Sequence, residues 1–297
     1  MMFIIIAIGY FVTKKGILSV KARADVTDLV LYVVLPCNIF SSFSKDVSSD
    51  ILRQCFVVLI VSTCVHLFYT LVSRILYLRA RPEHKEVMQY ATIISNSGFM
   101  GLPVIESVFG QIGLLYGSIN LVPLRIFMWT AGLSLFTKTQ TKEKIKMLAT
   151  HPCIWAVVLG LVYLLIPLEL PSFIMVTIDT IGNCTTMLSM LVVGSLLSGV
   201  DLKSIVDKDC FYFTVLRLIA IPAVVFCALL LLKVDKYVTG VVTLSSAMPA
   251  ATVTAMLAEK YGRDSQFASK ILFISTAFSL VTLPVAAKIL TTVLNIS

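Results

Sequence analysis

The chain has 297 residues, of which 58% are hydrophobic and only 13% are charged, and its mean hydropathy is +0.95. Soluble domains are roughly 45–50% apolar and about 25% charged, so this composition excludes an ordinary soluble protein. A membrane-spanning helix needs roughly 20 residues, which leaves room for about ten spans with short loops. The net charge of +8 does not indicate a nucleic-acid partner, because the basic residues lie between apolar segments, where they set membrane orientation.

Ten apolar segments follow one another along the chain. Their approximate bounds are 2–13, 26–43, 54–77, 87–109, 112–136, 152–167, 172–199, 209–232, 237–259 and 267–294. The polar linker 138–151 separates a first set of five, residues 1–137, from a second set of five, residues 152–297. The sequence therefore predicts an all-α transmembrane fold of ten helices in a lipid bilayer.

The basic residues between these segments predict the orientation of the chain. Seventeen of the 24 Lys and Arg residues fall on one side of the predicted membrane, in the segments 14–23, 74–85, 138–146, 203–208 and 260–270. Loops rich in Lys and Arg stay in the cytoplasm. We therefore expect this side to be cytoplasmic and both termini to be extracytoplasmic, in the cell (inner) membrane.

The odd number of spans in each set has a topological consequence. Five spans followed by a cytoplasmic linker and five more place the two sets in opposite orientations. This arithmetic predicts an inverted 5+5 repeat, which is common among secondary transporters. A ten-helix channel or membrane enzyme could have the same count.

The fourth segment of each set contains helix-breaking residues near its middle. The first holds Gly98, Gly101 and Pro103, and the second holds Ser246 and Pro249. Proline removes a backbone donor and clashes with the preceding turn, whereas glycine tolerates unwound backbone. Ordinary proline kinks are one interpretation. Matched breaks in the two halves favour a transporter binding site.

Broken helices favour an anion as the bound molecule. The N-terminal end of a half-helix presents free N–H groups and positive partial charge. Nearby side chains could add donors and acceptors. The predicted substrate-binding residues at the breaks are Ser95, Asn96, Ser97, Gly101, Pro103, Ser246, Pro249 and Thr252.

Four ionisable residues within the apolar segments are further candidates, since a charge inside a membrane is costly unless it is paired or hydrated. Arg125 and Arg217 could each bind a substrate carboxylate, or each could be locked internally by a carboxylate or by backbone carbonyls. Glu106 and Asp179 could carry a coupling proton, or they could pair with an arginine or face water. We add Arg125 to the predicted substrate-binding residues.

Catalytic signatures are missing from the sequence. It has no HExxH, GxSxG, Walker or GxGxxG motif, and His66, His84 and His151 lack metal-ligand spacing. We expect a protein that is not an enzyme and that holds no metal or other cofactor. The tryptophans and tyrosines are interpreted mostly as lipid or interface anchors.

Several segments resemble the auxin efflux carrier family, in particular its bacterial members, and more distantly the plant PIN-FORMED carriers. The resemblance covers nearly the whole chain. The matching segments are Asn96–Val104 (NSGFMGLPV), Glu106–Gly110, Trp129–Gly132, Leu188–Leu197 (LSMLVVGSLL), Leu216–Pro222 (LRLIAIP), Ala247–Gly262 (AMPAATVTAMLAEKYG) and Phe273–Pro284.

This resemblance implies an inverted 5+5 repeat like that of bile-acid symporters and Na⁺/H⁺ antiporters, in which broken helices four and nine cross near Pro103 and Pro249. Helices 1, 2, 6 and 7 would form a scaffold and a homodimer interface, and helices 3–5 and 8–10 an elevator-like transport domain. Asn96 would lie beside the substrate. Family substrates are organic anions, either auxin or dicarboxylates such as malate and malonate. Arg125 departs from the family pattern and could indicate a more highly charged substrate.

Two alternatives remain open. A Na⁺-coupled organic-anion symporter of the bile-acid type has a similar ten-helix plan, but it should have acidic Na⁺ ligands around the crossover, where only Glu106 and Glu259 are present. A membrane sensor that binds a ligand without moving it would also fit, although no soluble signalling domain is attached.

Overall fold

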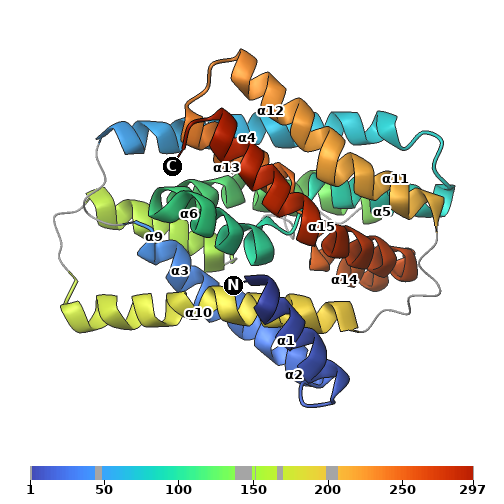
Figure 1. Ribbon diagram of the computed structural model, residues 1–297, viewed down its shortest axis with the longest axis horizontal. Helices are drawn as coiled ribbons and strands as arrows, with labels where there is room; N and C mark the ends of the chain where they lie inside the picture. Colours follow the sequence, from blue (N-terminus) through green and yellow to red (C-terminus); the bar gives the residue numbers. More distant parts are fainter. Residues whose placement is uncertain are drawn as a thin grey trace.

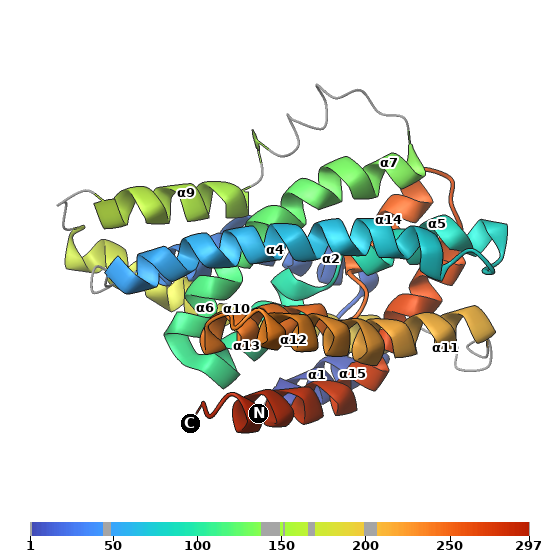
Figure 2. The ribbon, with the colours of Figure 1, turned by 90° about the horizontal axis from the view of Figure 1, so that it is seen from above.

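The computed structural model describes residues 2–43, 49–137, 149–150, 152–165, 170–198 and 207–296. Residues 138–148 of the predicted linker lie outside this part of the chain. The described residues form helices and no strand beyond one isolated bridge between Ser95 and Ala250. Figures 1 and 2 show the long helices α4 (Ser49–Leu76) and α10 (Ser172–Ser198) lying along the longest axis of the molecule.

A first group of helices comes from the beginning of each half of the chain and packs together: α1 on α10, and α3 on both α9 and α10. Besides α10, this group comprises α1 (Met2–Lys14), α2 (Val20–Leu29), the π-helical turn η1 (Val30–Val34), α3 (Leu35–Ser41) and α9 (Pro152–Leu165). The backbones of α1 and α10 touch, since a Cβ added to Gly194 would lie 2.0 Å from the Ile6 carbonyl oxygen.

A second group contains the broken helices. In the first half, α4 packs on α5 and α6. In the second half, α13 packs on both α12 and α15, and η5 also contacts α15. Besides α4, its members are α5 (Pro82–Ile93), η2 (Ser97–Gly101), α6 (Leu102–Phe127), η3 (Met128–Gly132), α7 (Leu133–Phe136), α11 (Lys208–Val215), η5 (Leu216–Ala220), α12 (Ile221–Leu231), α13 (Lys236–Ser246), α14 (Thr252–Lys260) and α15 (Ser265–Val293).

Helix α6 reverses direction at Gly110. This residue has φ +65° and ψ −157° inside an otherwise helical segment, a conformation that glycine adopts without steric cost. Beyond it, a Cβ on Gly117 would lie 2.8 Å from the Leu102 side chain, so the two arms of α6 pack against each other. The segments 87–109 and 112–136, expected as separate helices, thus join in one helical hairpin.

Within the described part of the chain, six helical stretches are long and apolar enough to cross a membrane: Lys21–Ser41, Asp50–Leu76, Ser97–Phe136, Ser172–Ser195, Lys208–Leu231 and Ser265–Val293. The helices Ile4–Lys14 and Pro152–Tyr163 are apolar but shorter. The predicted spans 87–109 and 237–259 are each interrupted, the first after α5 and the second between α13 and α14. The prediction of an all-helical, multi-pass membrane fold is therefore confirmed, while the inverted repeat of ten helices stays a prediction.

Large apolar side chains cover much of the outer surface. Phe11, Leu71 and Val281 are each more than 60% exposed, and Leu231 is 84% exposed. A soluble protein rarely exposes contiguous apolar surface of this kind. A bilayer is the solvent that suits these helix faces.

The start of α5 is tied to the starts of α11 and α15 through the side chain of His84. His84 Nδ1 lies 2.8 Å from Asp209 Oδ2, and its Nε2 lies 3.7 Å from Asp264 Oδ2. The His84 ring also stacks on Phe267, with ring centroids 3.7 Å apart. These contacts bind together helices that come from both halves of the chain.

Candidate functional site

The two broken helices cross at their breaks. Helix α5 ends at Ile93 and the chain is extended at Ile94, while α13 ends at Ser246 and α14 begins at Thr252. The intervening segments run antiparallel: Ser95 bridges Ala250, and the Asn96 N–H donates to the Pro249 carbonyl oxygen at 2.9 Å. Each break thereby supplies a hydrogen-bond partner for the backbone of the other, as a membrane interior requires.

The first break lies a few residues earlier than the glycines and proline indicated. The chain leaves the helix at 94–96, whereas Gly98 and Gly101 lie in the π-helical turn η2 and Pro103 lies in the first turn of α6. Proline is tolerated in a first turn because its N–H would be unpaired there. A Cβ on Gly101 would lie 3.3 Å from Met248 Cγ, so glycine permits the close approach of the second break.

Hydroxyl and amide groups connect the breaks to the neighbouring helices. Ser95 Oγ lies 2.7 Å from Ser97 Oγ, and Ser97 Oγ donates to the Ser245 carbonyl oxygen at 3.3 Å. Asn120 Nδ2 donates to Ser245 Oγ at 3.1 Å. The structure therefore brings the predicted residues Ser95 and Ser97 together with the second break.

A cavity of about 10 Å³ lies among these groups, large enough for about one water molecule. Its walls come from α4, the first break, α6 and α13, through Val65, His66, Tyr69, Ser95, Ser97, Asn120, Val242, Ser245 and Ser246. Tyr69 OH donates to Ser246 Oγ at 2.5 Å, and His66 Nδ1 lies 2.8 Å from the Ser62 carbonyl oxygen. The predicted residue Ser246 thus faces a polar space.

Arg217 binds the carbonyl ends of both broken helices. Its Nε donates to the Met248 carbonyl oxygen at 3.0 Å, and its Nη1 donates to the Thr92 carbonyl oxygen at 2.9 Å. The residue is fully buried, and its guanidinium lies 5.3 Å from the centre of the Tyr69 ring. Arg217 is thus locked by backbone carbonyls, one of the arrangements considered from the sequence.

Arg125 lies at the opposite end of the first break. Its Nη2 is 3.3 Å from the position of a Cβ on Gly98, in η2. Its Nη1 contacts the Met128 sulfur at 3.6 Å, and its Nε has no hydrogen-bond partner in the described structure. The described ion pairs are those of Arg81, His84 and Arg263, so neither intramembrane arginine pairs with a described carboxylate.

Glu106 lines a second polar cavity, of about 210 Å³, between α3, α6 and α10. The other lining residues are Asn38, Pro103, Ser107, Gly182, Asn183 and Thr186. Asn38 Oδ1 is buried without a partner in the described structure. Asp179 lies elsewhere on α10, where its carboxylate accepts a hydrogen bond from Ser41 of α3. Pairing of either acid with an arginine, one expectation from the sequence, is not found among the residues that the structure describes.

Asn96 and Thr252 flank the crossover. Asn96 is 6% exposed, and its carbonyl oxygen accepts from the N–H groups of Met100 and Gly101 at 3.0 Å. Thr252 is half-buried at the first residue of α14. Two residues later on α14, the Thr254 hydroxyl is buried without a partner among the described residues. Both half-helix starts thus carry polar side chains.

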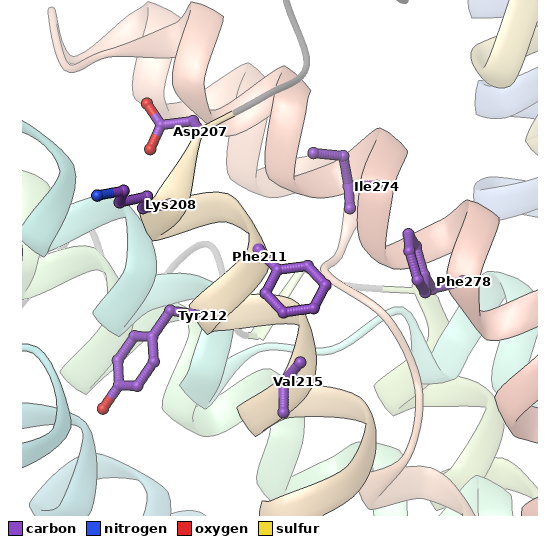
Figure 3. A pocket seen from close by; sticks show the side chains of 7 residues that line it. All are labelled: Asp207, Lys208, Phe211, Tyr212, Val215, Ile274 and Phe278. Atoms are coloured by element: carbon purple, nitrogen blue, oxygen red, sulfur yellow. The ribbon is translucent and has the colours of Figure 1, made fainter.

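Two larger cavities elsewhere in the described structure do not resemble a binding site for a small anion. A groove of about 550 Å³ lies between α11 and α15, and Figure 3 shows Phe211, Ile274 and Phe278 lining it, with Asp207 and Lys208 at the start of α11. Another cavity, of about 330 Å³ between α12, α13 and α15, has mostly aliphatic walls. His84, Asp207 and Asp209 could together hold a metal ion, but His84 already bonds Asp209.

Three residues of the site were not singled out from the sequence. Tyr69, interpreted as a lipid or interface anchor, is only 2% exposed and touches the second break. Asn120 and Asn38 are buried amides within apolar helices. A buried amide in an apolar helix is a signal that the sequence does offer, because such groups need hydrogen-bond partners.

Comparison with known proteins identifies the family of the chain. Residues 1–287 match the family described as membrane transport protein. Similar chains include an uncharacterized transporter of Methanocaldococcus jannaschii, 26% identical with 94% of each chain aligned, and one of Methanothermobacter thermautotrophicus, 27% identical with 97% of this chain and 95% of the relative aligned. A proposed malonate transporter of Rhizobium meliloti is 23% identical, with 94% of this chain and 90% of the relative aligned.

The family match confirms the resemblance drawn from the motifs and the expectation that the protein is not an enzyme. It also agrees with the several apolar helices of the described structure. The chain belongs to the membrane transport protein family, the family of the auxin efflux carriers, and is a membrane transporter.

Proposed function

We propose that this protein is a secondary carrier of small organic anions and that the anion binds at the crossover of the two broken helices. The observation that carries this proposal is the position of Arg217 on Thr92 and Met248. Each half-helix C-terminal end bears about half a negative charge. One guanidinium balances two such ends, so the negative side of the crossover is already neutralised.

The N-terminal ends of the half-helices, at the starts of η2 and α14, have no acidic residue beside them in the sequence to offset their positive charge. Each bears about half a positive charge and several free N–H groups. The segments 92–101 and 245–258 contain no Asp or Glu. A small carboxylate with one or two negative charges would balance these ends, which favours an anion over the Na⁺ of the alternative symporter.

The substrate class follows from the site together with one relative. A carboxylate suits helix N-termini and the hydroxyl and amide donors of Ser95, Asn96, Ser97, Ser246 and Thr252. The Rhizobium meliloti relative is a proposed malonate transporter. We therefore place mono- and dicarboxylates such as malate and malonate, or an auxin-like acid, among the substrates.

Movement of the second helix group against the first is the proposed transport step. Helices α1, α2–α3, α9 and α10 would form the scaffold and a homodimer interface, and the group with the crossover would move as an elevator. The halves 1–137 and 152–297 would be inverted repeats joined by a linker over 138–151. In this proposal the basic loops face the cytoplasm, and both termini lie outside the cell membrane.

Two substitutions test the proposed site. Asn96→Ala and Pro249→Ala should abolish carboxylate uptake by proteoliposomes while the purified variants keep wild-type unfolding temperatures to within a few degrees. Pro171→Ala, at an exposed position just before α10 in the first helix group, is the matched control and should transport normally. Wild-type uptake by both crossover variants would contradict the proposed site.

A further inference from the structure

Arg125 is a buried cation without a counter-ion among the described residues. The side chain is 8% exposed, and its Nε has no hydrogen-bond partner in the described structure. Its neighbours are uncharged sulfur groups, because Nη1 contacts the Met128 sulfur at 3.6 Å and the guanidinium also interacts with the Cys153 thiol. Leaving a buried charge uncompensated costs several kcal/mol. An ionisable side chain in this position within an apolar helix points to a missing partner.

The surroundings of Arg125 make that cost larger. Its Nη2 lies 3.3 Å from the Cβ position of Gly98, in the first turn of the half-helix after the break. The N-terminal end of a helix carries positive partial charge, so two positive potentials meet at one point. Arg217 has the opposite environment, since it contacts carbonyl oxygens at C-terminal ends. An anion beside Gly98 would relieve the first arrangement.

Two further buried donors near Arg125 are also unpartnered. Tyr90 is completely buried, its hydroxyl has no partner among the described residues, and it interacts electrostatically with Arg125. The Tyr90 ring is fixed by Gly132 and by stacking on Phe136. Trp129, one turn beyond Arg125, has a buried Nε1 without a partner. Buried polar groups are normally satisfied, so these donors lack an acceptor that a bound anion would supply.

We propose that Arg125, Tyr90 and the backbone N–H at Gly98 form a subsite for one carboxylate of a dicarboxylate, and that Arg125 sets the preference for doubly charged over singly charged substrates. The Nε edge of a guanidinium can hold a carboxylate in a bidentate pair. The second carboxylate would lie at the crossover. This inference rests on the proposed transport of organic anions.

The test compares dicarboxylate with monocarboxylate in proteoliposomes. Uptake of labelled malonate is measured with unlabelled malonate or propionate as competitor. Wild-type protein should prefer malonate, and Arg125→Gln should raise the half-saturating malonate concentration about ten- to hundred-fold, the loss expected for a charge-assisted pair, so that propionate competes as well as malonate. Arg125→Lys should restore part of the preference because it restores the charge.

Tyr90→Phe provides a second variant that changes one hydroxyl only. It should raise the half-saturating malonate concentration several-fold, whereas Tyr212→Phe, which loses a bond to the Leu76 carbonyl, should leave the preference unchanged. An unaltered malonate preference in folded Arg125→Gln and Tyr90→Phe would overturn the subsite while leaving the carrier function intact. Absence of uptake of any carboxylate by wild-type protein would instead contradict the carrier function.

Discussion

The backbone N–H of Asn96 donates to the carbonyl oxygen of Pro249 at 2.9 Å. The two residues are separated by about half of the chain, and each lies where its helix is interrupted. This bond and the Ser95–Ala250 bridge fix the two breaks against each other. The free N–H and C=O groups of both half-helix pairs consequently lie at one place.

Close packing at this crossing predicts the effect of enlarging Gly101. A Cβ there would lie 3.2 Å from Ser97 Cβ and 3.3 Å from Met248 Cγ, and the branched side chain of Gly101→Val would force the breaks apart. Overpacking costs about 1–3 kcal/mol, so we expect a lower unfolding temperature in detergent and loss of uptake. Ala223→Val, on the exposed face of α12, is the control; equal stability of both variants would argue against tight packing.

Removal of the Arg217 guanidinium should destabilise the crossover. Arg217→Met leaves the Thr92 and Met248 carbonyl oxygens without their donor, at about 1–3 kcal/mol for each buried acceptor. Thermal unfolding should therefore occur at a clearly lower temperature, with partial recovery in Arg217→Lys. Arg81→Met, which removes an exposed ion pair with Asp207, should cost about 0–1 kcal/mol. If Arg217→Met unfolds like Arg81→Met, Arg217 does not hold the two ends.

The Tyr69 hydroxyl should contribute modestly to stability. Tyr69→Phe removes the bond to Ser246 Oγ but keeps the ring beside Arg217. A typical buried hydrogen bond contributes about 1 kcal/mol, so a small fall in unfolding temperature is expected. Tyr69→Ala should cost several times more because the ring is also lost, and identical values for the two variants would show that the ring contact contributes nothing.

The contact between α1 and α10 depends on glycine at 194. A Cβ there would lie 2.0 Å from the Ile6 carbonyl oxygen and 2.9 Å from the Tyr10 backbone nitrogen, and backbone atoms cannot move aside as a flexible side chain would. Gly194→Ala should separate the two helices and lower the unfolding temperature. Val176→Ala, at a position on α10 that is 62% exposed, should have little effect, and a tolerated Gly194→Ala would disprove the close approach.

Local chemistry was enough to predict that the two segments break, because proline and glycine act on their own helix. It did not locate the first break at 94–96, since that position depends on pairing with Pro249 and Ala250, far away in the sequence. Similarly, Arg125 and Arg217 look alike in the sequence. Their difference arises from which helix ends they reach in the folded chain, one beside Gly98 and the other on Thr92 and Met248.

The sequence also did not reveal which aromatic residues with a polar group are buried. The tyrosines were interpreted from the sequence mostly as lipid or interface anchors, yet Tyr69 and Tyr90 are only 2% and 0% exposed. An amphipathic ring suits both a membrane interface and a buried site with a hydrogen-bond partner, and only tertiary packing separates these cases.

Counterflow is the most direct test of an anion carrier. Proteoliposomes are loaded with unlabelled malonate and diluted into buffer with a trace of labelled malonate. The proposed function predicts transient accumulation of label inside, above its equilibrium level, with wild-type protein and not with protein-free liposomes or with Asn96→Ala. Saturable binding of malonate, malate or auxin-like acids without accumulation of any of them would contradict it and indicate a sensor.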